Sequence, residues 1–189
     1  MKAGHVTEQD KGLKVLIRLL KDGKKLWKSH WLLSFLYLIA IVLANLSVAK
    51  FGPSATIINA FIFIGLDLTC RDSLHEAWHG KGLWWKMLLL ILTGGVVSAL
   101  FNIGALRIAI ASVVAFLLAG FFDTVIYTVL WKRKKIIKMN GSNVIASAVD
   151  SLAFPVIAFG GFSFVIFAGQ FFAKIVGGFL WSLLLAKDK

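Results

Sequence analysis

The chain has 189 residues, 59% of them hydrophobic, and a formal net charge of +12. A soluble domain of this length cannot bury so much apolar surface, so the long apolar runs indicate a membrane protein. The basic residues lie between these runs, which is typical of loops that face anionic lipid and argues against a nucleic-acid partner. With a single cysteine, Cys70, the chain can form neither an intrachain disulfide nor a cysteine-rich metal site.

The first segment, residues 1–30, is strongly basic. It contains eight Lys or Arg residues, and Leu13, Leu16 and Leu20 recur near helical spacing with lysines on the other side. This pattern predicts a short N-terminal amphipathic helix that lies on the membrane interface.

Six apolar stretches follow in residues 31–186, which we expect to form a single membrane domain. Each can cross a hydrocarbon core of about 30 Å as a helix that rises about 1.5 Å per residue. The sequence therefore predicts an all-α integral membrane protein with six transmembrane helices. The expected spans are 31–49, 53–69, 83–101, 105–131, 142–160 and 162–186, with a polar turn at 70–82 and a basic loop at 132–141.

The distribution of Lys and Arg predicts the orientation of the spans. If the N-terminus is inside, eighteen basic residues fall on the cytoplasmic side and two, Lys50 and Arg107, fall outside. Cytoplasmic loops carry such an excess of positive charge. We therefore expect a multi-pass protein of the inner (plasma) membrane with both termini in the cytoplasm.

The fifth stretch carries an acid within an apolar run. Asp150 in the middle of a membrane would cost about 2.5–3.5 kcal/mol on insertion scales. Asn143 and Ser147 before it and Ser151 after it share its face at helical spacing. A polar stripe of this kind usually faces a cavity or other helices rather than lipid.

Other polar residues interrupt the apolar spans. A structural Asp–Lys pair that fixes the helix register would explain the lysine together with one of the buried acids. Three acids and a lysine are more than one such pair requires, so we consider them candidates for a ligand-binding site. The candidate binding residues are Asn45, Asp67, Asp123, Asn143, Asp150, Phe154, Gln170 and Lys174.

The segment after the second span permits two interpretations. The first is the zinc-binding pattern H-E-x-x-H, formed by His75, Glu76 and His79, which would make the chain an intramembrane metalloprotease. Gly80 and Gly82 end the helix directly after the second histidine, and the pattern falls outside the apolar span. Two histidines at a membrane surface can also be simply solvated, so we assign no metal ligands.

The second interpretation is an acidic pair, Asp72 and Glu76, on one helix face. Taken with motifs elsewhere, this pair resembles the queuosine-precursor transporter family, also called the VUT family of vitamin uptake transporters. The resemblance covers most of the chain beyond residue 40. It rests on Ala44-Asn45 with Lys50, Asp72-x-x-x-Glu76, Asp123-x-x-x-Tyr127, and Ser142-Asn143 with Asp150-Ser151 and Phe154. Gly80 follows Glu76 by four residues, where the family pattern has three.

The resemblance implies transport rather than catalysis, with no cofactor. The implied substrate is a 7-deazaguanine such as preQ0 or preQ1, or a similar purine-like molecule. Carboxylates can accept the N–H groups of such a base, amides can read its carbonyl, and Phe154 can stack on its face. Lys50, Asp72 and Glu76 would form a gate or loop cluster, and the expected partners are the substrate, the lipid bilayer and further copies of the chain.

Two alternatives remain open at this point. One is the zinc protease described above. The other is the substrate-binding subunit of an ATP-driven vitamin importer, which would need a separate ATPase because the chain has no nucleotide-binding loop of its own.

Overall fold

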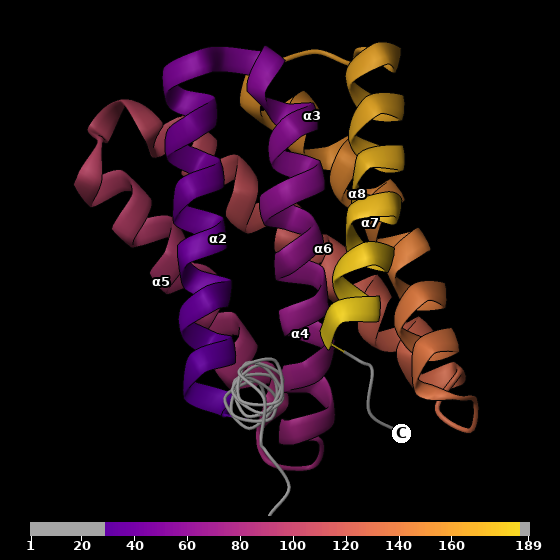
Figure 1. Ribbon diagram of the computed structural model, residues 1–189. Helices are drawn as coiled ribbons and strands as arrows, with labels where there is room; N and C mark the ends of the chain where they lie inside the picture. Colours follow the sequence, from indigo (N-terminus) through magenta and orange to yellow (C-terminus); the bar gives the residue numbers. More distant parts are fainter. Residues whose placement is uncertain (1–28, 186–189) are drawn as a thin grey trace, which may run out of the picture.

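The computed structural model describes residues 29–185, which form a bundle of helices joined by short turns (Figure 1). No strand occurs within these residues. The predicted interfacial helix lies almost wholly outside the described residues. The main helices are α2 (His30–Phe51), α3 (Ala55–Asn59), α4 (Gly65–Trp78), α5 (Leu83–Phe101), α6 (Leu106–Val129), α7 (Lys135–Phe159) and α8 (Phe164–Leu185).

The first two apolar stretches form a hairpin. Gly52 has a φ of 69° and a ψ of −158°, a conformation that is open essentially only to glycine, and it starts the 3₁₀ turn η1 (Gly52–Ser54). The chain then returns through α3, the π-helical turn η2 (Ala60–Ile64) and α4, which lies beside α2 (Figure 1). We refer to this end of the bundle as the Gly52 end and to the opposite one, where α4 meets α5, as the Gly80 end.

Five helices in the described part of the chain are long and apolar enough to cross a membrane. The all-helical fold class is confirmed, and these five helices have the length and composition of membrane spans. The first of the five, His30–Trp78, has 49 residues and includes the whole hairpin. A straight helix of that length would measure about 73 Å, more than twice a hydrocarbon core. The count of six spans stays a prediction, which the hairpin supports.

Two segments predicted as loops are helical in part. The polar turn expected at 70–82 is helix up to Trp78, because Cys70 and Leu74 pack into the core and the neighbouring charged side chains find partners. Only the short link with Gly80 and Gly82, both at positive φ, leaves the helix. The expected basic loop at 132–141 becomes α7 from Lys135 onward.

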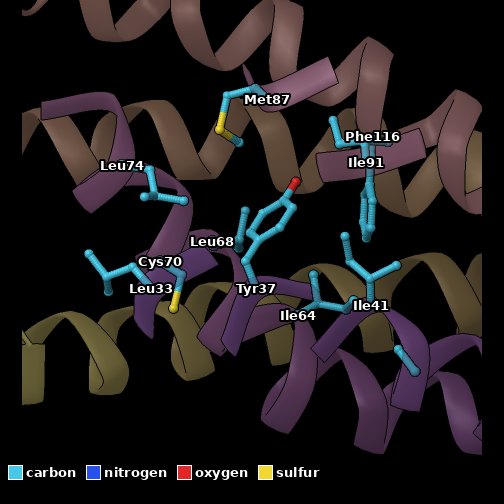
Figure 2. Packing of buried hydrophobic residues seen from close by; sticks show 11 residues of the cluster. Leu33, Tyr37, Ile41, Ile64, Leu68, Cys70, Leu74, Met87, Ile91 and Phe116 are labelled. Atoms are coloured by element: carbon cyan, nitrogen blue, oxygen red, sulfur yellow. The ribbon is translucent and has the colours of Figure 1, made fainter. Parts of the chain in front are cut away.

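Small residues let the helices approach closely, as is common in membrane bundles. A Cβ at Gly177 of α8 would overlap the carbonyl group of Phe61, and one at Gly94 of α5 would overlap the side chain of Ile41. The largest apolar cluster joins α2, α4, α5 and α6 (Figure 2). Phe116 lies in this cluster, near the middle of α6. The polar side chains described next are held between these packed helices.

Candidate functional site

The polar stripe of α7 faces the interior of the bundle, as its spacing predicts. Ser147 and Ser151 are fully buried and Asp150 is 6% exposed, whereas Val144 and Leu152 on the opposite face are exposed. Because the helix presents its polar residues to α8, α4 and α6 rather than to lipid, the buried polar groups need partners from those helices.

Asp150 forms a buried ion pair with Lys174 of α8. The Lys174 Nζ lies 2.5 Å from Asp150 Oδ2, and it donates hydrogen bonds to Ser151 Oγ at 2.9 Å and to Gln170 Oε1 at 3.1 Å. Lys174 is 2% exposed. Three oxygen partners around one ammonium group hold the cation firmly and position Asp150 and Gln170 beside each other.

This ion pair forms part of the wall of a cleft whose volume is about 330 Å³ when the open space at its rim is included. Two of its side chains have buried polar atoms without a hydrogen-bond partner among the described residues: Asp150 Oδ1, an acceptor, and Gln170 Nε2, a donor. A buried polar atom without a partner is rare and often marks a place where another molecule binds. The lining residues are Ala44, Asn45, Val48, Thr56, Asn59, Ile64, Ser112, Phe116, Asp150, Phe154, Gln170 and Lys174.

Two asparagines line the cleft on its side toward the Gly52 end. The Asn45 Nδ2 donates to Ser98 Oγ at 3.1 Å, and the Asn59 Nδ2 donates to the Ala44 carbonyl at 3.1 Å. Both side chains are buried. Their amides are thus fixed in orientation by the protein before any ligand arrives, which lowers the entropic cost of binding.

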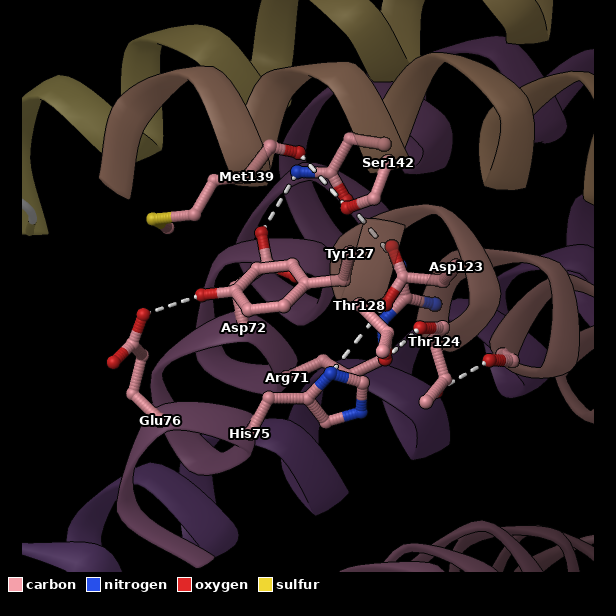
Figure 3. A network of polar contacts seen from close by, with 12 residues as sticks. Arg71, Asp72, His75, Glu76, Asp123, Thr124, Tyr127, Thr128, Met139 and Ser142 are labelled. Carbon is pink, nitrogen blue, oxygen red and sulfur yellow. Dashed lines mark hydrogen bonds and ion pairs between the residues drawn. The ribbon is translucent and has the colours of Figure 1, made fainter. Parts of the chain in front are cut away.

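A second buried cluster lies closer to the Gly80 end (Figure 3). Arg71 of α4 forms an ion pair with Asp123 of α6, with 3.1 Å between Arg71 Nη2 and Asp123 Oδ1. The same Nη2 donates to Asn143 Oδ1 at 3.2 Å, and Asn143 Nδ2 donates to Asp72 Oδ2 at 2.9 Å. This cluster, named the arginine cluster below, ties α4, α6 and α7 together.

Glu76 extends the polar contacts to the Gly80 end. Its Oε1 accepts a hydrogen bond from the Tyr127 hydroxyl at 2.6 Å and forms an ion pair with Lys138 Nζ at 2.8 Å. Lys138 also lies over the Trp131 ring, 4.1 Å from its centroid. One carboxylate therefore links α4 to both α6 and α7, which explains why the segment with the acidic pair is helical.

The structure distributes the predicted site residues over these two places. Asn45, Asp150, Phe154, Gln170 and Lys174 line the cleft. The other predicted residues lie elsewhere: Asp123, Asn143 and Asp72 in the arginine cluster, Glu76 beside it, and Lys50 exposed at the Gly52 end, over the Phe51 ring.

Asp67 lies between the two places. It is 1% exposed, and its Oδ1 has no hydrogen-bond partner among the described residues. It is within electrostatic reach of both Arg71 and Lys174, the cations of the two clusters. A buried carboxylate near two cations helps to balance the charge of the interior.

The two histidines of the zinc pattern have separate partners. His75 Nδ1 lies 3.6 Å from Asp123 Oδ2, while the His79 ring stacks on Trp131 with 4.3 Å between centroids. Within residues 29–185, no three His, Cys, Asp or Glu side chains come together as metal ligands would. The geometry therefore does not support the protease interpretation.

Several residues of these sites were not among the predicted ones. Asn59 and Ser112 are polar residues in apolar stretches, a signal that could have identified them. Arg71 lies next to the acidic pair in the sequence, but nothing in the pattern of α4 indicates its ion pair with Asp123 of α6. Phe116 is apolar in an apolar helix, and nothing in its pattern distinguishes it from its neighbours.

An all-helical bundle that encloses ion pairs and a polar cleft at membrane depth has the architecture of a membrane transport protein. Comparison with protein families agrees. The chain belongs to the family described as putative vitamin uptake transporter, whose model, Vut_1, matches residues 23–186. Neither the curated proteins nor the solved structures include a significant match to this chain. The family to which the sequence motifs pointed is thereby confirmed.

Proposed function

We propose that this protein takes up a 7-deazaguanine, such as preQ0 or preQ1, and that the cleft beside Asp150 binds it. The observation that supports this most is the pair of unpartnered buried atoms in the cleft, Asp150 Oδ1 and Gln170 Nε2. The two side chains share Lys174 as a partner, so an acceptor and a donor lie close together.

A guanine-like base has the complementary edge. Its ring N–H and exocyclic amine are donors, and the adjacent carbonyl is an acceptor. Asp150 Oδ1 would accept from the donors, and Gln170 Nε2 would donate to the carbonyl. Phe154 and Phe116 line the same cleft and offer aromatic faces for the ring.

Lys174 would support this recognition without itself contacting the base. Its contact with Asp150 engages Oδ2 and leaves Oδ1 without a protein partner, so that Oδ1 can accept from a ligand. A charged acceptor in a low-dielectric interior forms stronger hydrogen bonds than a neutral one. Selectivity for a base with adjacent N–H groups would follow from this arrangement.

Uptake by the purified protein alone tests the proposal. Proteoliposomes preloaded with unlabelled preQ0 should accumulate external radiolabelled preQ0 by exchange, and excess preQ1 should compete. A purine that lacks the exocyclic amine should compete poorly, because Asp150 then loses a donor. Empty liposomes supply the background. Absence of exchange would contradict the proposal, and exchange that appears only with a co-reconstituted ATPase would favour the importer-subunit alternative.

We further propose six membrane passes with both termini in the cytoplasm of the inner membrane. The hairpin at Gly52 supports an even number of passes, and the distribution of basic residues supports the orientation. A C-terminal alkaline phosphatase fusion, which is active only outside the cytoplasm, should be inactive, while a fusion after Phe51 should be active. The opposite pattern would contradict this topology.

A further inference from the structure

A crevice between α5 and α6 lies next to the binding cleft, with Phe116 in the walls of both. Its volume is about 700 Å³ when the open space at its rim is included, and its walls include Leu88 and Ile91 of α5 and the exposed side chains of Leu117 and Phe121 of α6. A larger hollow of about 1010 Å³ at the Gly80 end shares His75, Leu83, Trp84, Trp85 and Thr124 with it. Because they share these residues, the crevice adjoins this hollow, which we call the mouth.

The deep end of the crevice has a polar feature. Arg71 lines it, is 3% exposed, and has an Nε atom without a hydrogen-bond partner among the described residues. The Nη2 atom of the same guanidinium contacts Asp123 and Asn143. An unpartnered donor on a buried cation is costly in an apolar wall, so it suits an acceptor that enters the crevice.

Phe116 alone among the described residues lines both the cleft and the crevice. It is 6% exposed and packs in the central apolar cluster, where Figure 2 shows it beside Ile91. The cleft extends toward the Gly52 end, through Thr56 and Asn59, and the crevice extends toward the Gly80 end. One aromatic ring thus separates two hollows that lead to opposite ends of the bundle.

We propose that the crevice is the second chamber of the transport path and that Phe116 is the septum between the chambers. This inference rests on the proposed function. The planar base would leave the Asp150 cleft when the Phe116 ring turns, enter the crevice with a ring nitrogen or carbonyl accepting from Arg71 Nε, and exit at the Gly80 end past Trp84 and Trp85. The aromatic residues of the mouth offer stacking faces for that last step.

Cysteine protection tests whether the base visits the crevice. Thr124 lines both the crevice and the mouth, and Val125 beside it is exposed outside them. In proteoliposomes, saturating preQ0 should slow the reaction of Thr124→Cys with a maleimide several-fold and leave Val125→Cys unaffected. The wild type supplies the background, because its only thiol, Cys70, is buried.

The septum is tested by shortening its side chain. Phe116→Leu keeps an apolar residue in the core and opens the barrier, so net efflux of preQ0 should become several-fold faster than in wild type. Phe122→Leu, on the exposed side of the same helix, should keep the wild-type rate. Equal rates of preQ0 efflux for the two variants would contradict the proposal that Phe116 separates the two chambers.

The outcomes separate this inference from the proposed function. If wild-type protein exchanges preQ0 but saturating preQ0 does not protect Thr124→Cys, the second chamber is wrong while the cleft stands. If added anionic phospholipid, rather than preQ0, protects Thr124→Cys from the maleimide, the second chamber is also wrong and the crevice is a lipid site. If wild-type protein neither binds nor exchanges preQ0, the proposed function itself fails.

Discussion

Asp150→Asn should weaken preQ0 binding by roughly ten- to a hundredfold, because the cleft loses a charge-assisted contact of about 1.5–3 kcal/mol. The variant should still fold, because the asparagine oxygen can accept a hydrogen bond from Lys174. Lys174 also keeps its hydrogen bonds to Ser151 and Gln170. Its unfolding temperature in detergent should fall, because the ion pair is lost. Binding is therefore compared below the unfolding temperature of both proteins, by calorimetry on purified samples.

Ser147→Ala is the matched control for this variant. Ser147 is buried on the same face of α7, one turn before Asp150, but it does not line the cleft. Its replacement should leave preQ0 affinity unchanged. An Asp150→Asn protein that unfolds early yet binds preQ0 with wild-type affinity would show that the Asp150–Lys174 pair serves stability alone.

Asp123→Asn should cause the largest loss of stability. Asp123 is fully buried, and its removal leaves the Arg71 guanidinium without its ion-pair partner on α6. Breaking a buried pair from one side costs about 3–5 kcal/mol. We expect a much lower unfolding temperature for Asp123→Asn and for Arg71→Gln, measured by differential scanning fluorimetry in detergent.

The double variant Arg71→Gln with Asp123→Asn distinguishes an ion pair from two independent effects. Its unfolding temperature should be higher than that of either single variant, because no buried charge is left alone and the two amides can form a hydrogen bond with each other. Thr124→Val, next to Asp123, removes only a hydrogen bond to the Gly120 carbonyl and should change stability little. Additive losses in the double variant would contradict the assigned pair.

The sequence predicted the polar face of α7 and the membrane class well, because both follow from spacing along a single helix. It could not show which helices face each other. Asp123 and Asp150 were grouped as one binding site, yet the structure places them in separate clusters, because Arg71 joins Asp123 across 52 residues of chain. Such pairing depends on how α4 and α6 pack, which the pattern of either helix does not contain.

Asn143 illustrates the same limit along one helix. It shares a face with Asp150, but seven residues of helix separate them by about 10 Å, so the two side chains meet different neighbours. Asn143 joins Arg71 and Asp72, while Asp150 joins Lys174. A pair between one acid and Lys174 was among the possibilities that the sequence left open, and the structure forms it with Asp150.

The most direct test of the account is preQ0 exchange measured side by side in proteoliposomes that hold equal amounts of wild-type, Asp150→Asn and Ser147→Ala protein. We predict exchange by wild type and Ser147→Ala with similar half-saturating concentrations. Asp150→Asn should need a roughly ten- to a hundredfold higher concentration, in line with one lost charge-assisted contact. Exchange by folded Asp150→Asn protein that matches wild type at every concentration would contradict the assignment of this cleft as the binding site.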